Sequence, residues 1–148
     1  MILEQGQWAD TLLIAERLQL SRLGVWSLMS IVAGTAILTA LRLRRVDSSL
    51  LFQFALQQLG WGILHAVQTF WWRSHLTLRD LSSAVQLDRL AWFGAGVDVG
   101  VILVGVALAA FGGRKGRRLA FVGAGVGVTL QGAARLLFDA QLAALVVR

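Results

Sequence analysis

The chain has 148 residues, of which 57% are hydrophobic, and it carries a formal net charge of +6. The absence of Cys excludes disulfides and thiolate metal sites, and the absence of Pro removes the usual cause of kinked helices. A mean hydropathy of +0.69 is far above that of an ordinary soluble domain and indicates a single domain, residues 1–148, that lies almost wholly in lipid.

Helical periodicity predicts an amphipathic helix ahead of the first apolar stretch. In residues 1–22, the side chains of Trp8, Leu12, Ala15 and Leu18 recur at helical spacing, with charged residues off that stripe. We expect this segment to lie in the membrane interface, with Trp8 at head-group depth. The alternative is an N-terminal extension of the first membrane span.

Four apolar stretches follow, each long enough to cross a hydrocarbon core about 30 Å thick as a helix that rises about 1.5 Å per residue. Membrane spans are expected at residues 23–41, 50–72, 90–111 and 119–140. A short amphipathic surface helix is expected in the connection between the second and third spans. The predicted fold class is therefore all-α, a four-helix transmembrane bundle with an N-terminal amphipathic interfacial helix.

The distribution of basic residues predicts how the bundle is oriented. The short connections at residues 42–49 and 112–118 hold seven of the 14 Lys and Arg residues, with Asp47 as their only acid. The positive-inside rule places both connections in the cytoplasm and both termini outside. We expect a multi-pass protein of the bacterial inner membrane whose basic residues contact lipid head groups and not nucleic acid.

A polar side chain recurs at a similar depth in each of the four spans. Counting inward from the outer end of each span places these groups roughly 8–13 Å deep at about 1.5 Å per residue. A carboxylate at the bilayer centre costs on the order of 2.5–3.5 kcal/mol on insertion scales, so a partner is expected for it. The residues expected to meet inside the bundle, with the base on the fourth span compensating the acid on the third, are Ser30, His65, Asp98, Gln131 and Arg135.

Glycines in the third and fourth spans favour close helix packing. Gly96 and Gly100 form one GxxxG pattern, and Gly123 and Gly127 form another. Together with Gly132, they are expected to let the third and fourth spans approach each other. The same stretches resemble phosphate-binding loops only in their letters, because they lie in the middle of apolar spans.

The candidate catalytic and metal-binding residues are few. Two His residues and scattered carboxylates do not predict a metal site. His65, with Trp61 on the same helical face, could alone ligate the magnesium of a chlorophyll-type pigment. Asp98 and Asp139 are the only candidate pair of catalytic carboxylates, and they are expected at different depths, so we predict no enzymatic activity.

Four segments, one from each span, carry a resemblance to a known family. They read LGVWSLMSIVAG (23–34), LGWGILH (59–65), VDVGVILVG (97–105) and LQGAARLLFD (130–139). Together they resemble a family of small, uncharacterised four-span bacterial inner-membrane proteins, and the resemblance implies the four-span fold and the polar layer but no assigned activity. The positions that fit the family pattern directly are Asp98, Gln131, Gly132 and Asp139. Departures from the pattern are Gly62 and His65, which stand where the family tends to have Asn residues after a Trp, and Ser30, which stands where its first span often has Asn.

Three functions are left open by these observations. The first is a non-enzymatic membrane subunit that packs into or stabilises a larger inner-membrane assembly, with a photosynthetic or respiratory complex as the expected host. The second is a binder or transporter of a small molecule, lipid, quinone or pigment that uses the polar layer around Asp98. The third is self-association through the glycine-rich faces. A pair of Asp98 and Arg135 that only fixes helix register is an alternative to any ligand role.

Overall fold

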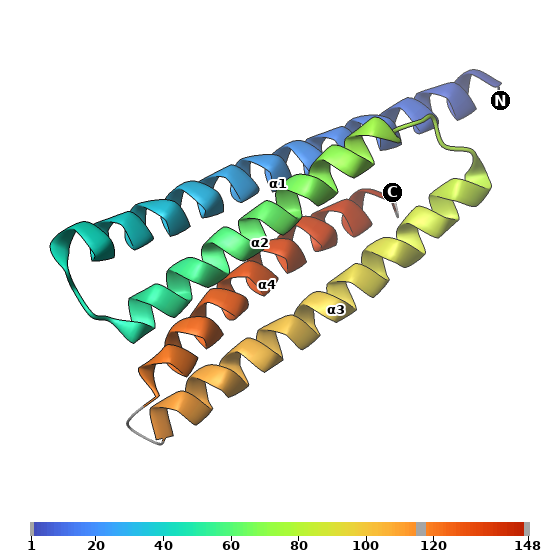
Figure 1. Cartoon of the computed structure of the whole chain (residues 1–148). Coiled ribbons are helices and arrows are strands. Elements are labelled where there is room, and N and C mark those ends of the chain that lie inside the picture. Colours follow the sequence, from blue (N-terminus) through green and yellow to red (C-terminus); the bar gives the residue numbers. More distant parts are fainter. Residues whose placement is uncertain (1, 115–117, 147–148) are drawn as a thin grey trace.

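The computed structural model describes residues 2–114 and 118–146, and the side chains of residues 9–114 and 118–145. It contains four helices, α1 (Ile2–Arg44), α2 (Ser49–Ser74), α3 (Leu81–Arg114) and α4 (Leu119–Val146), which confirms the all-α class. The helices run up and down alternately, so that α1 begins and α4 ends at the same end of the bundle as the α2–α3 connection (Figure 1). We call this the terminal end.

The first helix differs from its prediction. Residues 2–44 form one continuous helix, so a separate interfacial helix at residues 1–22 is not formed. The physical reason is that the apolar stripe of this segment packs on protein: Ala15 is buried in a cluster with Ala91 of α3 and Leu142 of α4. The predicted depth of Trp8 concerns a side chain outside the described ones.

The third helix begins earlier than the predicted span. It starts at Leu81, so the expected surface helix between the second and third spans is the first part of α3 itself. Asp80 precedes it, and its carboxylate accepts a hydrogen bond from the Ser83 backbone N–H at 2.9 Å and another from the Ser83 hydroxyl. These hydrogen bonds lower the pKa of Asp80 below its ordinary value and cap the helix start.

Close helix approach depends on small residues at the helix crossings. Helix α4 packs against α3, α2 and α1, and α1 packs against α2. A Cβ atom at Gly105 of α3 would overlap the backbone of Gly125 on α4, and one at Gly123 would overlap the Leu50 carbonyl of α2. A Cβ at Gly62 of α2 would likewise crowd the backbone of α1. Small residues at these crossings are typical of helix packing in membranes.

Among the residues that the structure describes, three helices are long and apolar enough to cross a membrane, namely Ala9–Arg44, Leu81–Arg114 and Leu119–Leu145. Their large apolar side chains point outward and are exposed, whereas many of the buried side chains are polar. This distribution is the reverse of that in a soluble domain, where the apolar side chains fill the core. The structure therefore indicates a membrane protein with a polar interior.

Candidate functional site

A buried glutamine on α4 joins three of the four helices. Gln131 is 1% exposed, and its Nε2 donates hydrogen bonds to Gln58 Oε1 at 2.7 Å and to Ser30 Oγ at 3.1 Å. Its Oε1 accepts a hydrogen bond from Trp26 Nε1 at 2.8 Å. Both amide hydrogens and the amide oxygen of Gln131 are thus used. We call Trp26, Ser30, Gln58 and Gln131 the amide cluster, and it ties α1 and α2 to α4.

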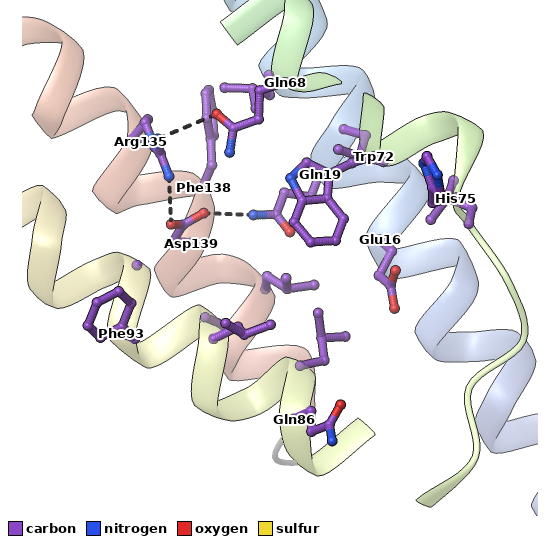
Figure 2. Close-up of a pocket in the computed structure, with 18 of the residues that line it drawn as sticks. Glu16, Gln19, Gln68, Trp72, His75, Gln86, Phe93, Arg135, Phe138 and Asp139 are labelled. Carbon is purple, nitrogen blue, oxygen red and sulfur yellow. Dashed lines mark hydrogen bonds and ion pairs between the residues drawn. The ribbon is translucent and has the colours of Figure 1, made fainter. Parts of the chain in front are cut away.

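One turn further along α4, Arg135 lies between two carboxylates. Its Nε is 3.3 Å from Asp98 Oδ1, its Nη2 is 3.7 Å from Asp139 Oδ2, and its Nη1 donates to Gln68 Oε1 at 3.5 Å. Gln19 Nε2 donates to Asp139 Oδ1 at 2.8 Å (Figure 2). We call these five residues the carboxylate cluster; all four helices contribute to it.

Four of the five residues predicted to meet are found in these two clusters. Ser30 and Gln131 lie in the amide cluster, and Asp98 and Arg135 lie in the carboxylate cluster. The predicted single layer is therefore two adjoining levels, because the four residues from Gln131 to Arg135 rise about 6 Å along α4.

The fifth predicted residue, His65, is completely buried beside Trp61, with ring centroids 5.7 Å apart. Neither ring nitrogen has a hydrogen-bond partner among the described residues. Ligation of a pigment magnesium needs a ring nitrogen that opens onto room for a large flat macrocycle, and a side chain with 0% exposure has no such opening. The burial of His65 therefore gives the pigment prediction no support. Within residues 9–114 and 118–145, no group of three His, Asp or Glu side chains could hold a metal ion.

Several members of the clusters were not predicted as site residues. Asp139 was expected at a different depth from Asp98, and its Oδ2 lies opposite Gly94, one turn before Asp98 on α3. Arg135, one turn before Asp139, nevertheless reaches both carboxylates. Gln58 and Gln68 lie seven residues before and three residues after His65, so helical spacing along α2 alone would have placed all three on one face. Trp26 and Gln19 carried no comparable signal, because Gln19 fell in the segment assigned to the membrane interface.

The first predicted glycine pair does not pack against another helix. A Cβ atom at Gly96 or at Gly100 would meet nothing within 4 Å, so the prediction that they bring α3 close to α4 is wrong. Each lies two residues from Asp98, which is about 200° around a helix of 3.6 residues per turn. Since Asp98 faces α4, both glycines lie on the opposite side of α3.

The remaining predicted glycines do pack, but two of them pack on a different helix. A Cβ at Gly123 would meet Leu50, and one at Gly127 would lie 2.7 Å from the Gln57 Cβ, so both face α2 and not α3. Only Gly132 faces α3, where a Cβ would lie 3.2 Å from the Asp98 carbonyl oxygen. Helix α4 therefore uses glycine on two faces.

The carboxylate cluster borders a cavity of about 350 Å³ at the terminal end. Gln19, Gln68, Arg135 and Asp139 supply polar groups to its lining, which Figure 2 shows converging from α1, α2 and α4. The other polar lining residues are Glu16, His75, Arg79 and Gln86. The rest of the lining is largely apolar and aromatic and includes Leu20, Leu23, Trp72, Leu90, Phe93, Val97 and Phe138. Ligand pockets in proteins have this size and this combination of apolar walls with a few convergent polar groups.

An ion pair stands at the side of the cavity nearest the terminal end. Arg79, in the α2–α3 connection, donates from Nε to Glu16 Oε1 at 2.8 Å and from Nη2 to Glu16 Oε2 at 3.1 Å. Both residues line the cavity. The hydrogen bond to Glu16 raises the pKa of the Arg79 guanidinium above its ordinary value. The ion pair formally joins one positive and one negative group and so adds no net charge.

Comparison with protein-family models matches residues 22–140 to a family of unknown function, DUF6992. The match begins at Arg22 and covers most of the helical bundle, including the amide cluster and all of the carboxylate cluster except Gln19. No curated protein and no solved structure matches the chain.

Proposed function

The chain belongs to this family of unknown function, and we propose that it is an integral membrane protein that binds a small molecule in the cavity beside the carboxylate cluster. One observation supports the proposal above all: the polar interior does not close on itself but borders a cavity of ligand size at one end of the bundle. We keep the prediction that the protein is not an enzyme, because Arg135 engages both carboxylates.

We propose that all four helices cross the membrane, α2 included. Helix α2 has 26 residues, about 39 Å at about 1.5 Å per residue, which exceeds a hydrocarbon core about 30 Å thick. Helix α2 is not among the three helices that are apolar enough by composition to cross a membrane, because it carries polar side chains that point inward. Gln58 and His65 are buried, and Gln53, Gln57 and Gln68 are half-buried. Its exposed face carries large apolar side chains, including Phe52, Leu56, Ile63, Leu64 and Val67.

The proposed orientation puts the cavity on the outer side of a bacterial inner membrane. The connections at residues 42–49 and 112–118 are cytoplasmic by their basic residues, so the terminal end faces outward. Along α4, Arg135 is 16 residues and Asp139 is 20 residues from Leu119, or about 24 Å and about 30 Å. The cavity then lies at the outer edge of the hydrocarbon core.

The accessory-subunit function stays a prediction. The outward apolar faces fit lipid as well as they fit another membrane protein, so nothing in them favours a photosynthetic or respiratory host. Self-association through Gly123 and Gly127 is less favourable than the sequence indicated, because α2 of the same chain covers both residues.

The proposed function is tested with three probes that share one body and differ in charge: 2-phenylethanol, the 2-phenylethylammonium ion and phenylacetate. Each is titrated into the protein in lipid nanodiscs, with empty nanodiscs as the blank for partitioning. Leu90→Trp places a larger side chain in the lining of the cavity. Leu103→Trp is the matched control, since Leu103 is on the same helix, is similarly exposed at 64% against 56%, and does not line the cavity.

We expect at least one probe to bind the native protein, with a dissociation constant that Leu90→Trp raises about tenfold or more, equivalent to about 1.4 kcal/mol. Leu103→Trp should leave that constant unchanged. The proposal is overturned if no probe binds at millimolar concentration above the empty-nanodisc blank. It is also overturned if a folded Leu90→Trp protein binds as the native protein does.

A further inference from the structure

We infer that the ligand of this cavity is an organic ammonium ion with a small apolar or aromatic body. The inference rests on the proposed function and names the chemical class of the ligand. It depends on three features of the described residues, namely the balance of charge around the cavity, the balance of hydrogen-bond donors and acceptors, and the aromatic character of the walls.

The charge around the cavity is not balanced. Two acids, Glu16 and Asp139, and two bases, Arg79 and Arg135, line the cavity. The buried Asp98, which pairs with Arg135 behind the lining, adds a third acid and leaves one negative charge with His taken as neutral. The Glu16–Arg79 pair is neutral in sum, so the excess belongs to the carboxylate cluster. A net charge held at the edge of a hydrocarbon core is costly unless a proton or a cation neutralises it.

Two carboxylate oxygens of the carboxylate cluster also lack a donor at hydrogen-bond distance among the described residues. Each of the three guanidinium nitrogens of Arg135 already faces an oxygen atom, of Asp98, Asp139 or Gln68. In contrast, Asp98 Oδ2 is buried and has no hydrogen-bond partner among the described residues. Asp139 Oδ2, at 3.7 Å from Arg135 Nη2, is beyond ordinary hydrogen-bond length.

This imbalance selects the chemistry of the ligand. An anion would add negative charge to a cluster in which two carboxylates already face one guanidinium. An ammonium group brings three donors and no acceptor, which is what the unsatisfied carboxylate oxygens require. The cluster is therefore complementary to a cation that donates hydrogen bonds, and Asp139, which itself lines the cavity, is the residue it reaches first.

The walls fit the body of such a ligand. Trp72, Phe93 and Phe138 line the same cavity as Asp139. Aromatic rings attract cations, and their apolar surface takes up the hydrocarbon part of such a molecule. Because the cavity lies at the outer edge of the membrane, it suits an amphiphilic cation that enters from the interface.

Proton binding should compete with the ligand. The titratable and charged groups that line the cavity or lie beside the carboxylate pair are Arg135 on α4, His65 on α2, Glu16 on α1, and His75 and Arg79 from the α2–α3 connection. In the absence of a cation, one carboxyl group of the pair is expected to hold a proton, since two carboxylates share one guanidinium. Lower pH therefore weakens binding of an ammonium ion and leaves binding of an uncharged probe unchanged.

The experiment compares the same three probes on the native protein in nanodiscs and on two charge variants. Asp139→Asn removes one negative charge from the cavity. Asp47→Asn is the matched control, because it removes the same charge from the exposed α1–α2 connection at the opposite end of the bundle. A second measurement needs no variant: the native protein is titrated between about pH 5 and pH 8, where an aliphatic ammonium stays charged.

We expect 2-phenylethylammonium to bind about tenfold tighter than 2-phenylethanol, with phenylacetate weakest. Asp139→Asn should remove most of the preference for the ammonium without changing the affinity for the alcohol, and Asp47→Asn should change neither. In the native protein the ammonium affinity should fall as the pH falls. If the alcohol or phenylacetate binds as tightly as the ammonium, or if the ammonium affinity is independent of pH, the inference is wrong while the proposed function stands. If none of the probes binds, both are wrong.

Discussion

Replacement of Gln131 by Leu isolates the contribution of the amide cluster to the stability of the bundle. Leu is close to Gln in volume, so the variant Gln131→Leu creates no large cavity and removes only the amide. It eliminates hydrogen bonds to three side chains on two other helices, those of Trp26, Ser30 and Gln58. Ser30 and Gln58 are left buried inside the bundle, where water is scarce.

The expected cost follows from the number of hydrogen bonds lost. Side-chain hydrogen bonds between membrane helices contribute about 0.6 kcal/mol on average and about 1.7 kcal/mol at most. Three of them give about 2 kcal/mol, with an upper bound of about 5 kcal/mol. Gln57→Leu is the matched control, because the Gln57 amide accepts one hydrogen bond, from Trp61 on its own helix, and so should cost about 0.6 kcal/mol or less.

The free energy of unfolding of both variants is measured in bicelles, with the native protein alongside. We expect Gln131→Leu to lower it by about 2 kcal/mol and clearly more than Gln57→Leu does. The reasoning is refuted if the two variants cost the same, or if Gln131→Leu is as stable as the native protein. Either result would mean that the amide cluster does not hold α1 and α2 to α4.

Three further predictions concern other parts of the bundle. Arg135→Leu leaves Asp98 and Asp139 without a counter-charge and should lower the free energy of unfolding by about 3 kcal/mol or more. Adding Asp98→Leu should restore part of that loss. A double variant that is no more stable than the single one would count against the ion pair. Gly96→Ala should stabilise α3 by about 0.5–1 kcal/mol, because its Cβ meets open space. In contrast, Gly123→Ala should lower the melting temperature, because its Cβ overlaps the Leu50 carbonyl. Equal effects of the two variants would contradict the helix packing. Hydrogen bonds from Ser83 and Ser82 lower the pKa of Asp80, so its carboxylate stabilises the start of α3 at pH values above its ordinary pKa of 3.8. This stabilisation is lost as the pH falls through the lower pKa that Asp80 has in the folded protein. The test is amide hydrogen exchange at residues 81–84, corrected for the intrinsic effect of pH. In the native protein, these amides should be less protected below the lowered pKa of Asp80 than above it. In Asp80→Ala they should be weakly protected both above and below that pH.

The parts of the fold that the sequence predicts are those with a local physical cause. Long apolar stretches separated by basic connections predict the helices, because a span must be about 20 residues long and its flanks must be polar. The pairing of Asp98 with Arg135 follows from depth, since a charge in an apolar span requires a partner at its own level. Neither deduction needs information about helix rotation.

The parts that the sequence does not predict depend on how each helix is turned and on what covers it. Gly96 and Gly100 form a pattern known from packed helices, yet that pattern does not say which side of α3 faces α4, and the position of Asp98 decides against them. The stripe containing Ala15 fits a membrane surface and a protein surface equally well. Its partners, Ala91 and Leu142, come from distant parts of the chain and are joined to it only by the fold.

The central claim is that the polar interior opens at the terminal end as a cavity that water and ligands reach. The chain contains no Cys, so a single Cys reports on one position. Val97 and Val104 lie on the same helix with similar exposed fractions, 47% and 57%, but only Val97 lines the cavity. A membrane-impermeant thiol reagent, added to the outer face of protein in liposomes, should modify the Val97→Cys protein rapidly and the Val104→Cys protein hardly at all. Equal rates, or modification of Val97→Cys only from the opposite face, would contradict the account.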